Sequence, residues 1–258
     1  MTAKTKIITF SNQKGGVGKT TTCINLAAYL ANDGKSVLVI DMDPQGNASS
    51  GLGFEGRNSA KSLYKVLCGN MSVKEAVFQT AIPSLKLLPS TMDLAGAEIE
   101  LAQVVIGRER VLDEKLAEIK DVFDYIMIDC PPSLGLLTVN ALAASNSVLV
   151  PIQCEYYALE GLSQMMNTVR LVKKFLNPSL EVEGVVLTLY DGRAKLSTQV
   201  ADEIIKFFGD KVFKTKIPRN VRLAEAPSYG KPIVLYDKAC AGAKAYGALK
   251  CEFLKRVK

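Results

Sequence analysis

The sequence predicts an α/β fold in which a mostly parallel, twisted sheet has helices on both of its faces. Two observations support this fold class. Short apolar runs alternate along the chain with longer stretches of helical pattern, which is typical of βαβ units. Residues 37–40 and 148–150 are continuously apolar, as expected for strands that are covered on both faces. The length of 258 residues fits one domain, and no linker or internal repeat divides residues 1–258.

The expected elements follow this alternation. Strands are expected at the apolar runs Lys6–Ser11, Ser36–Asp41, Leu85–Leu88, Tyr125–Asp129, Ser147–Ile152, Gly184–Leu189 and Val212–Ile217. Helices are expected near residues 19–31, 59–67, 73–78, 107–120, 134–144, 159–176 and 196–208. The Asn-Asp-Gly tripeptide at 32–34 is a typical helix stop.

The last stretch, residues 243–258, has an apolar helical face surrounded by lysines and one arginine. The apolar residues are Tyr246, Leu249, Phe253, Leu254 and Val257. An amphipathic helix at a membrane surface would show such a pattern, and so would a final helix packed on the sheet with a basic solvent face. We expect the packed helix, because the apolar stripe begins where the fold still needs a covering helix.

Composition restricts the chemistry that the chain can perform. There is no histidine, so acid–base or metal chemistry must use carboxylates, lysines or backbone groups. The six cysteines show no C-x-x-C pair and no metal-ligand spacing, which indicates scattered buried thiols in a reducing cytoplasm. No apolar stretch approaches the roughly 18 residues that span a bilayer, and the N-terminus has no signal-peptide pattern.

The charge is distributed unevenly between the two halves of the chain. Residues 1–129 carry 14 Lys and Arg against 15 Asp and Glu, a net charge of −1. Residues 130–258 carry 18 against 11, a net charge of +7. A polyanionic partner for the second half is one explanation, and ordinary solvated lysines are the other.

Residues 12–22 read NQKGGVGKTTT and form the most informative segment. They follow the apolar run at 7–10 and precede a helical stretch, and this arrangement builds a phosphate cradle from backbone N–H groups and a helix N-terminus. Lys19 would reach the β- and γ-phosphates, and the Thr20 hydroxyl would bind Mg²⁺. The residues expected to contact the nucleotide here are Lys14, Gly15, Gly16, Val17, Gly18, Lys19, Thr20 and Thr21.

This loop departs from the usual P-loop pattern at its beginning. The position five residues before Gly18 is Gln13, where the usual pattern has glycine, and a second lysine, Lys14, precedes the paired glycines. Another glycine-rich segment, residues 51–56, matches G-x-G-x-x-G. It does not directly follow a strand or open a helix, so we expect a mobile loop there and no dinucleotide site.

Three carboxylates follow predicted strands at the sheet edge where α/β proteins place their ligands. Asp41 and Asp43 lie at the end of the second strand, and a turn aspartate before Pro44 is the alternative for Asp43. Asp129 ends the apolar run 125–128, the Walker-B arrangement for holding a metal-bound water.

The loop at 14–20 resembles the deviant P-loop of the ParA/MinD class of ATPases. Further motifs resemble the ParA/Soj partition branch of that class: DMDPQGN at 41–47, DCPPS at 129–133, EYYALEG at 155–161 and IPRNVRLAEAP at 217–227. The motifs extend from residue 12 to residue 227, so the resemblance covers nearly the whole chain. It implies a P-loop NTPase fold with a deviant Walker A loop.

The resemblance also implies roles for individual residues. Asp43 would position and activate the attacking water, and Asp41, with Thr20 and Asp129, would support the Mg²⁺ shell. Lys14 would be the signature lysine that crosses a dimer interface to the partner's phosphates, with an exposed lysine beside the loop as the alternative. ATP binding and homodimer formation would then be one event.

Two further pairs of residues acquire roles through the same resemblance. Pro218 and Asn220 match the segment that holds the adenine. Arg193 and Arg222 match positions that bind double-stranded DNA without sequence preference, and surface salt bridges are the alternative for both. Since only about six residues precede the first strand, we expect no helix-turn-helix extension and no sequence-specific operator binding.

The function that the resemblance implies is a Mg²⁺-dependent partition ATPase, cytoplasmic and associated with the nucleoid. A ParB/Spo0J-type centromere-binding protein would stimulate hydrolysis and release the ATP-bound dimer from DNA. The alternative is a MinD-like division-site ATPase bound to the membrane. A metabolic relative such as an amidoligase or an iron–sulfur reductase lacks support, because paired cluster cysteines and a substrate domain are both missing from the sequence.

Overall fold

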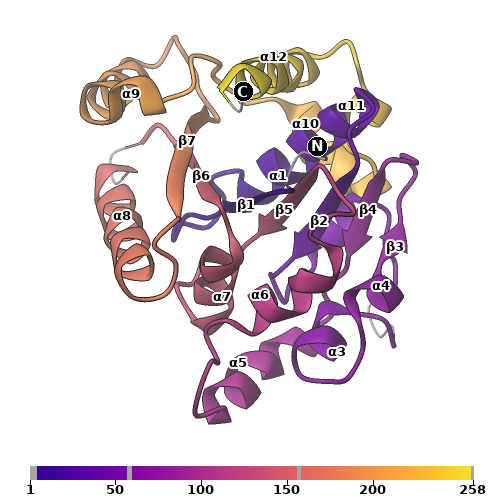
Figure 1. Ribbon diagram of the computed structural model, residues 1–258. Coiled ribbons are helices and arrows are strands. Elements are labelled where there is room, and N and C mark those ends of the chain that lie inside the picture. Colours follow the sequence, from indigo (N-terminus) through magenta and orange to yellow (C-terminus); the bar gives the residue numbers. More distant parts are fainter. Residues whose placement is uncertain (1–4, 57–59, 156–157, 257–258) are drawn as a thin grey trace.

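The computed structural model describes residues 5–56, 60–155 and 158–256, and these form one sheet with helices on both faces (Figure 1). The sheet has seven strands in the order β3-β4-β2-β5-β1-β6-β7. β3 pairs antiparallel with β4, and every other neighbouring pair is parallel. The predicted fold class is confirmed. The strands are β1 (Lys6–Phe10), β2 (Val37–Asp41), β3 (Phe78–Gln79), β4 (Leu85–Leu88), β5 (Tyr125–Asp129), β6 (Ser147–Gln153) and β7 (Glu181–Thr188).

The helices connect these strands and cover the sheet. They are α1 (Lys19–Asn32), α2 (Asn47–Gly51), α3 (Leu63–Leu67), α4 (Val73–Ala76), α5 (Leu94–Gln103), α6 (Val111–Leu116), α7 (Leu136–Ala144), α8 (Ala158–Phe175), α9 (Lys195–Phe208), α10 (Val221–Glu225), α11 (Ile233–Tyr236) and α12 (Ala241–Arg256). Three short 3-10 helices are η1 (Ala117–Ile119), η2 (Gly209–Lys211) and η3 (Ala226–Tyr229). In Figure 1, α8 and α9 lie beside β7 at one edge of the sheet, and β3 forms the other edge.

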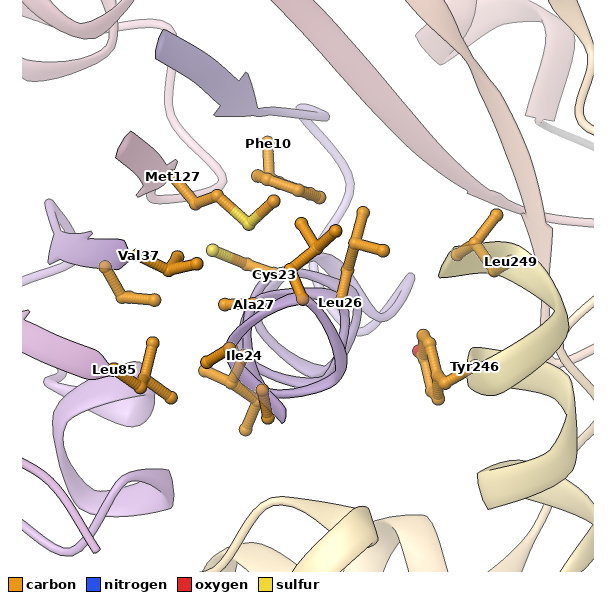
Figure 2. Packing of buried hydrophobic residues seen from close by; sticks show 14 of the residues in the cluster. Phe10, Cys23, Ile24, Leu26, Ala27, Val37, Leu85, Met127, Tyr246 and Leu249 are labelled. Carbon is orange, nitrogen blue, oxygen red and sulfur yellow. The ribbon is translucent and has the colours of Figure 1, made fainter. Parts of the chain in front are cut away.

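Successive side chains of the central strands point to opposite faces of the sheet, so each strand contributes to a different hydrophobic cluster on each face. Ile8 and Phe10 of β1 join the cluster under α1 and α12, whereas Ile7 joins the cluster under α3 to α7. A third cluster packs α8 and α9 on β6 and β7. Figure 2 shows the first cluster around α1, where Cys23 points toward Phe10 and Met127 while α12 approaches from the other side. The central strands are therefore buried on both faces, as their continuous apolar runs predict.

The predicted strand at 212–217 is wrong. Val212 and Pro218 make isolated bridges to Val185 and Tyr190, and the N–H groups of Phe213 and Ile217 donate to carbonyls of β7, but the ladder is interrupted between these two residues. The carboxylate of Glu252 on α12 accepts hydrogen bonds from the backbone N–H groups of Lys214 and Thr215 at 2.7 and 2.9 Å. A side chain on another helix thus takes the donors that a strand ladder would use.

Several further boundaries differ from the expectation. α5 and the short elements α2, β3, α10 and α11 were not predicted, although the buried positions of α5, Leu94, Ala97 and Leu101, follow a helical spacing. The predicted helix 107–120 is divided into α6 and η1, and the predicted helix 59–67 begins at Leu63. Residues 51–56 close α2 and open no helix, so the dinucleotide fingerprint is absent there. Ser59, Tyr156, Tyr157 and Val257 lie outside the described residues.

The final helix is packed, as expected. Tyr246, Leu249 and Phe253 of α12 are buried in the cluster that α1 shares. The Phe253 ring meets the edge of Tyr125 on β5, with ring centroids 5.8 Å apart, and the hydroxyls of Tyr246 and Thr22 are 3.2 Å apart. The apolar face of α12 is therefore used within the fold.

Replacing Phe253 with alanine tests this packing. Removing a fully buried phenylalanine typically costs about 3–5 kcal/mol, so the midpoint of chemical unfolding should fall strongly. Phe207 of α9 is the matched control, because it is 74% exposed and its replacement by alanine should change stability by less than about 0.5 kcal/mol. Equal, small shifts for both variants in a urea titration would contradict the packed position of α12.

Candidate nucleotide-binding and catalytic site

The carboxyl ends of β1, β2 and β5 meet at one edge of the sheet and form the site. The parallel register places Phe10 and Asp41 on either side of Asp129, the last residue of the central strand β5. The loop that follows β1 leads into α1, and the loop that follows β2 leads into α2. Residues from distant parts of the sequence, 11–20, 41–49 and 129–133, are thereby brought to the same edge.

The glycine loop is shaped to leave space above its backbone. Gly16 and Gly18 have φ angles of 75° and 81°, a left-handed conformation that favours glycine. A Cβ placed on Gly15 or Gly16 would meet no described atom within 4 Å, and both glycines are exposed. A phosphate chain can therefore approach the backbone closely at the start of α1.

Lys19 is the cation of this loop, and it is 7% exposed. Its Nζ donates a hydrogen bond to the carbonyl oxygen of Lys14 at 3.1 Å, so the ammonium group lies back across the loop. Burial lowers the pKa of Lys19, and the nearby carboxylate of Asp129 opposes that shift. A buried ammonium with few partners is well suited to bind phosphate oxygens.

Asp41 is fully buried and its carboxylate is already engaged. It accepts hydrogen bonds from the N–H of Asp43 at 3.1 Å and from the N–H and hydroxyl of Ser49, both at 2.7 Å. Burial raises the pKa of Asp41 to about 6, although the hydrogen bonds from Ser49 oppose the shift. Asp41 thus holds the 41–49 loop in place, and its expected part in the Mg²⁺ shell stays a prediction.

Asp129 is also fully buried, yet both of its carboxylate oxygens lack a hydrogen-bond partner among the described residues. Burial raises the pKa of Asp129 well above its usual range, and the neighbouring carboxylate of Asp41 raises it further. The Thr20 hydroxyl and the Lys19 ammonium lie close enough to oppose the shift. An unpaired buried carboxylate is costly and indicates that a cation or a metal-bound water belongs beside it.

These residues fit Mg²⁺ bound together with a nucleotide. Mg²⁺ in phosphate-transfer sites takes few protein ligands and fills its shell with water and phosphate oxygens. The Thr20 hydroxyl and the free oxygens of Asp129 provide such ligands or water acceptors. Within residues 5–56, 60–155 and 158–256, no group of three or more Cys, Asp or Glu side chains forms a metal cage, so the phosphates would have to supply the other ligands.

Asp43 lies at the entrance of the 41–49 loop and is 8% exposed. Its carboxylate accepts a hydrogen bond from the N–H of Gln45 at 2.9 Å, and its carbonyl accepts one from Gly46 at 2.9 Å. The turn that was the alternative for Asp43 therefore exists. Among the described residues the other carboxylate oxygen accepts no hydrogen bond, so a turn role and contact with a water are compatible.

Lys14 makes an ion pair with Glu155, the second residue after β6. Both side chains are more than one third exposed. The backbone N–H of Lys14 donates to the side-chain oxygen of Asn12 at 3.0 Å, and the amide of Asn12 donates to the carbonyl of Pro151 at 2.8 Å. Lys14 is therefore held on its own subunit by residues near the end of β6, and its expected role as the signature lysine stays a prediction.

The predicted adenine segment follows the isolated bridge between Tyr190 and Pro218. The side-chain oxygen of Asn220 is buried and lacks a hydrogen-bond partner among the described residues. A buried, unpaired amide oxygen can accept a hydrogen bond from an exocyclic amine such as that of adenine. This observation fits the expected role of Asn220, which stays a prediction.

Arg193 and Arg222 follow the two segments that the Tyr190–Pro218 bridge joins. Both make the surface ion pairs that were the alternative for them. Arg193 pairs with Asp191 at 3.1 Å, and Arg222 pairs with Glu225 at 2.9 Å and with Asp237 at 3.6 Å. The Arg193 side chain is nevertheless 92% exposed, so it can also reach a partner.

Some residues of the site were not identified from the sequence. Ser49 and Asn12 each position their neighbours through two hydrogen bonds, and no spacing in the sequence marks them. Glu155 belongs to a quoted motif, but its charge opposite Lys14 becomes evident only in the fold. The expected thiols are present as six free cysteines, of which Cys23, Cys130 and Cys154 are buried and Cys251 is exposed.

Sequence comparison finds close relatives over nearly the whole chain. A family model described as an AAA domain matches residues 5–182. The sporulation initiation inhibitor protein Soj of Bacillus subtilis is 58% identical over 241 residues, which cover 93% of this chain and 95% of that protein. The chromosome partitioning protein ParA of Myxococcus xanthus is 53% identical over 97% of this chain and 88% of its own length.

Solved structures of the same fold include nucleotide complexes. A cobyrinic acid a,c-diamide synthase from Mycobacterium smegmatis with bound ADP and magnesium has a TM-score of 0.85 at 36% identity, and the match covers 98% of this chain and 95% of that chain. The cell division ATPase MinD of Pyrococcus furiosus has a TM-score of 0.79 at 30% identity, with 97% and 98% covered. The identities to Soj and ParA are much higher, so the chain belongs to the ParA/Soj family of chromosome-partitioning ATPases.

Proposed function

We propose that this chain hydrolyses ATP with Mg²⁺ to control its own binding to DNA during partition of replicated DNA. The observation that carries the ATPase site is the unpaired, buried carboxylate of Asp129 beside Lys19 and the exposed glycine loop. Nucleotide and magnesium together would supply the partners that these groups lack. The M. smegmatis neighbour, which contains ADP and magnesium, supports this placement.

In the proposed mechanism the loop residues and Lys19 bind the phosphates, and α1 adds its N-terminal N–H groups. Thr20 and Asp129 would hold Mg²⁺, which neutralises charge on the phosphates when it is bound. Asp43 would orient the attacking water through its free carboxylate oxygen. Pro218 and Asn220 would contact the adenine.

The proposal includes a dimer that forms when ATP binds. Lys14 would leave Glu155 and approach the partner's phosphates, where a second cation stabilises charge that develops in the transition state. Each site is then completed by the other subunit. A ParB-type protein would stimulate hydrolysis, and the dimer would dissociate.

DNA binding is proposed for the surface that contains Arg193 and Arg222. The support is the net charge of +7 on residues 130–258, together with the exposure of both arginine side chains. A dimer would present two such surfaces, and linking two weak binding surfaces increases apparent affinity without a new contact.

The MinD-like alternative needs a free apolar surface for lipid. The buried face of α12 argues against its use as an amphipathic membrane helix. No helix in the described part of the chain is long and apolar enough to cross a membrane. Binding of the ATP-loaded protein to duplex DNA and to anionic liposomes, compared at one ionic strength, separates the two functions.

Replacing Asp43 with alanine should block hydrolysis and keep nucleotide binding. Loss of a group that acts on the attacking water typically costs 10²–10⁴ in rate, whereas Lys19 and the loop still hold the phosphates. The ATP-bound dimer should therefore accumulate in sedimentation velocity runs. Asp121→Ala, at an exposed aspartate that belongs to none of the motifs, is the control. Normal turnover in Asp43→Ala would remove Asp43 from the mechanism.

Replacing Lys14 with glutamine should weaken ATP-driven dimerisation and should reduce the rate of partner-stimulated hydrolysis by roughly 10³–10⁵, the range for a cation supplied in trans. ATP affinity of the monomer should change little. Glu155→Gln is the matched variant, because it breaks the same intrachain ion pair and leaves the lysine in place. If Glu155→Gln reproduces the whole loss, the effect belongs to the ion pair and the trans role is wrong.

Replacing Arg222 with glutamate should weaken ATP-dependent binding to all DNA sequences alike. Each phosphate contact contributes a slope of about −0.9 to the dependence of log affinity on log salt, so the slope should become shallower in Arg222→Glu and in Arg193→Glu. Arg170→Glu, on the exposed side of α8, changes the charge equally and is the control. An unchanged slope in both test variants, measured by filter binding, would place the DNA surface elsewhere.

A further inference from the structure

We propose that Thr188, the last residue of β7, is a positioning residue that holds the phosphate loop in the shape that receives a nucleotide. The inference rests on the proposed placement of ATP on residues 14–20. Thr188 would touch neither the nucleotide nor the metal in this role. It would act through the backbone of Val17, between the two glycines with left-handed backbone.

The contact is short and buried. The Thr188 hydroxyl donates a hydrogen bond to the carbonyl oxygen of Val17 at 2.7 Å. Thr188 is 2% exposed and Val17 is 1% exposed, so water cannot replace the bond at either end. A buried carbonyl that loses its donor pays the full cost of desolvation, which makes the bonded arrangement strongly preferred.

The loop needs such a contact because its glycines place few restrictions on its backbone conformation. Gly16 and Gly18 adopt left-handed angles, and nothing lies within 4 Å of a Cβ placed on Gly15 or Gly16. The start of the loop is held where Asn12 donates to the carbonyl of Pro151, and its end is held where Thr22 donates to the carbonyl of Gly18. Thr188, on β7, fixes the middle of the loop at Val17, between these two points.

The backbone after Thr188 is held in an uncommon conformation. Leu189 has a φ angle of 49°, and it is the only residue other than glycine with a positive φ in the described parts of the chain. The residues before and after Leu189 are both held. Thr188 is paired in register with Gln153 of β6, and the N–H of Tyr190 donates to the carbonyl of Ile217 at 3.0 Å. A strained residue persists only where its surroundings fix it, and such residues cluster at functional sites. The direction of the Thr188 hydroxyl is thus determined from both sides.

The effect on nucleotide binding depends on the fraction of molecules in which the phosphate loop has the correct shape. A nucleotide binds the correctly shaped loop, and the apparent dissociation constant increases in proportion as that shape becomes less populated. Without the Thr188 hydroxyl, Gly16 and Gly18 allow the Val17 peptide to rotate, and the competent shape becomes a minority. Because bound nucleotide selects the competent shape again, turnover at saturating ATP should change less than affinity.

The test is Thr188→Val, which keeps the size and branching of the side chain and removes the hydroxyl. We expect the dissociation constant for ADP with Mg²⁺, measured by titration calorimetry, to increase about tenfold, equivalent to about 1.4 kcal/mol. KM for ATP should rise by a similar factor while kcat changes less than threefold. Thr188→Ser, which retains the hydroxyl, should restore ADP affinity to within about threefold of the original protein.

Thr80→Val is the matched control. Its hydroxyl donates to the carbonyl of Leu85 at 2.7 Å and is buried, at the end of the sheet opposite the site. The same hydroxyl also accepts a hydrogen bond from the N–H of Ile82 at 3.2 Å, so the control loses at least as many hydrogen bonds as Thr188→Val. It should lower the unfolding midpoint while ADP affinity stays unchanged.

The outcomes are distinguishable. Thr188→Val with unchanged ADP affinity, or Thr188→Ser as weak as Thr188→Val, overturns the role of the hydroxyl. Thr188→Ser and Thr188→Ala lose the same methyl group and differ in the hydroxyl, so this pair gives the same test if the valine variant does not fold. Lys19→Ala tests the underlying placement: if it binds ADP normally, the phosphate-loop assignment fails, and if it does not bind, only the Thr188 result bears on this inference.

Discussion

The parallel pairing of β1, β5 and β2 is the constraint on which the rest of the site depends. Because the three strands run in the same direction and in register, the glycine loop, Asp41 and Asp129 all reach one edge of the sheet. That edge places two carboxylates beside each other in a buried environment. Their raised pKa values report the cost of this arrangement. Burial disfavours the charged form of both, the carboxylate of Asp41 raises the pKa of Asp129 further, and the carboxylate of Asp43 raises the pKa of Asp41. Lys19 lies within the same cluster and offsets part of the cost.

The surrounding hydrophobic core offsets the free-energy cost of these buried charged groups. α1 begins at the site with Lys19 and continues through fully buried residues such as Ile24 and Leu26, so the helix that carries the phosphate loop is also the centre of the largest cluster. Figure 2 shows this helix enclosed between the sheet and α12. Burial of that many apolar side chains far exceeds the penalty of a few buried charges. Lys19 and Thr20 are thus carried by a helix whose body is buried in the core.

The sequence was sufficient for the parallel strands and for the residues at their carboxyl ends, because continuous apolar runs followed by Gly, Lys or Asp carry a strong local signal. The sequence was insufficient where a side chain that is distant in the chain determines the local backbone conformation or the hydrogen-bond partner. The segment 212–217 has the composition of a strand, yet Glu252 on α12 takes its backbone donors. The partners of Lys14 and of the Val17 carbonyl are likewise more than 100 residues away in the chain, and no local pattern reports them. A short helix such as α2 is specified mainly by Asp41, whose carboxylate accepts the Ser49 N–H.

The ion pairs of Arg193 and Arg222 do not exclude a role in DNA binding. Both are exposed, and exposed ion pairs contribute little because water solvates the separated charges well. Exchange of a carboxylate for a phosphate oxygen therefore costs little at either arginine. The same carboxylates, Asp191, Glu225 and Asp237, also weaken the positive potential of the surface in one subunit. Weak attraction by a single surface is the condition under which joining two subunits has a large effect on binding. In the proposed ATP-bound dimer, a nucleotide at the sheet edge would control an electrostatic contact at a separate surface in this way.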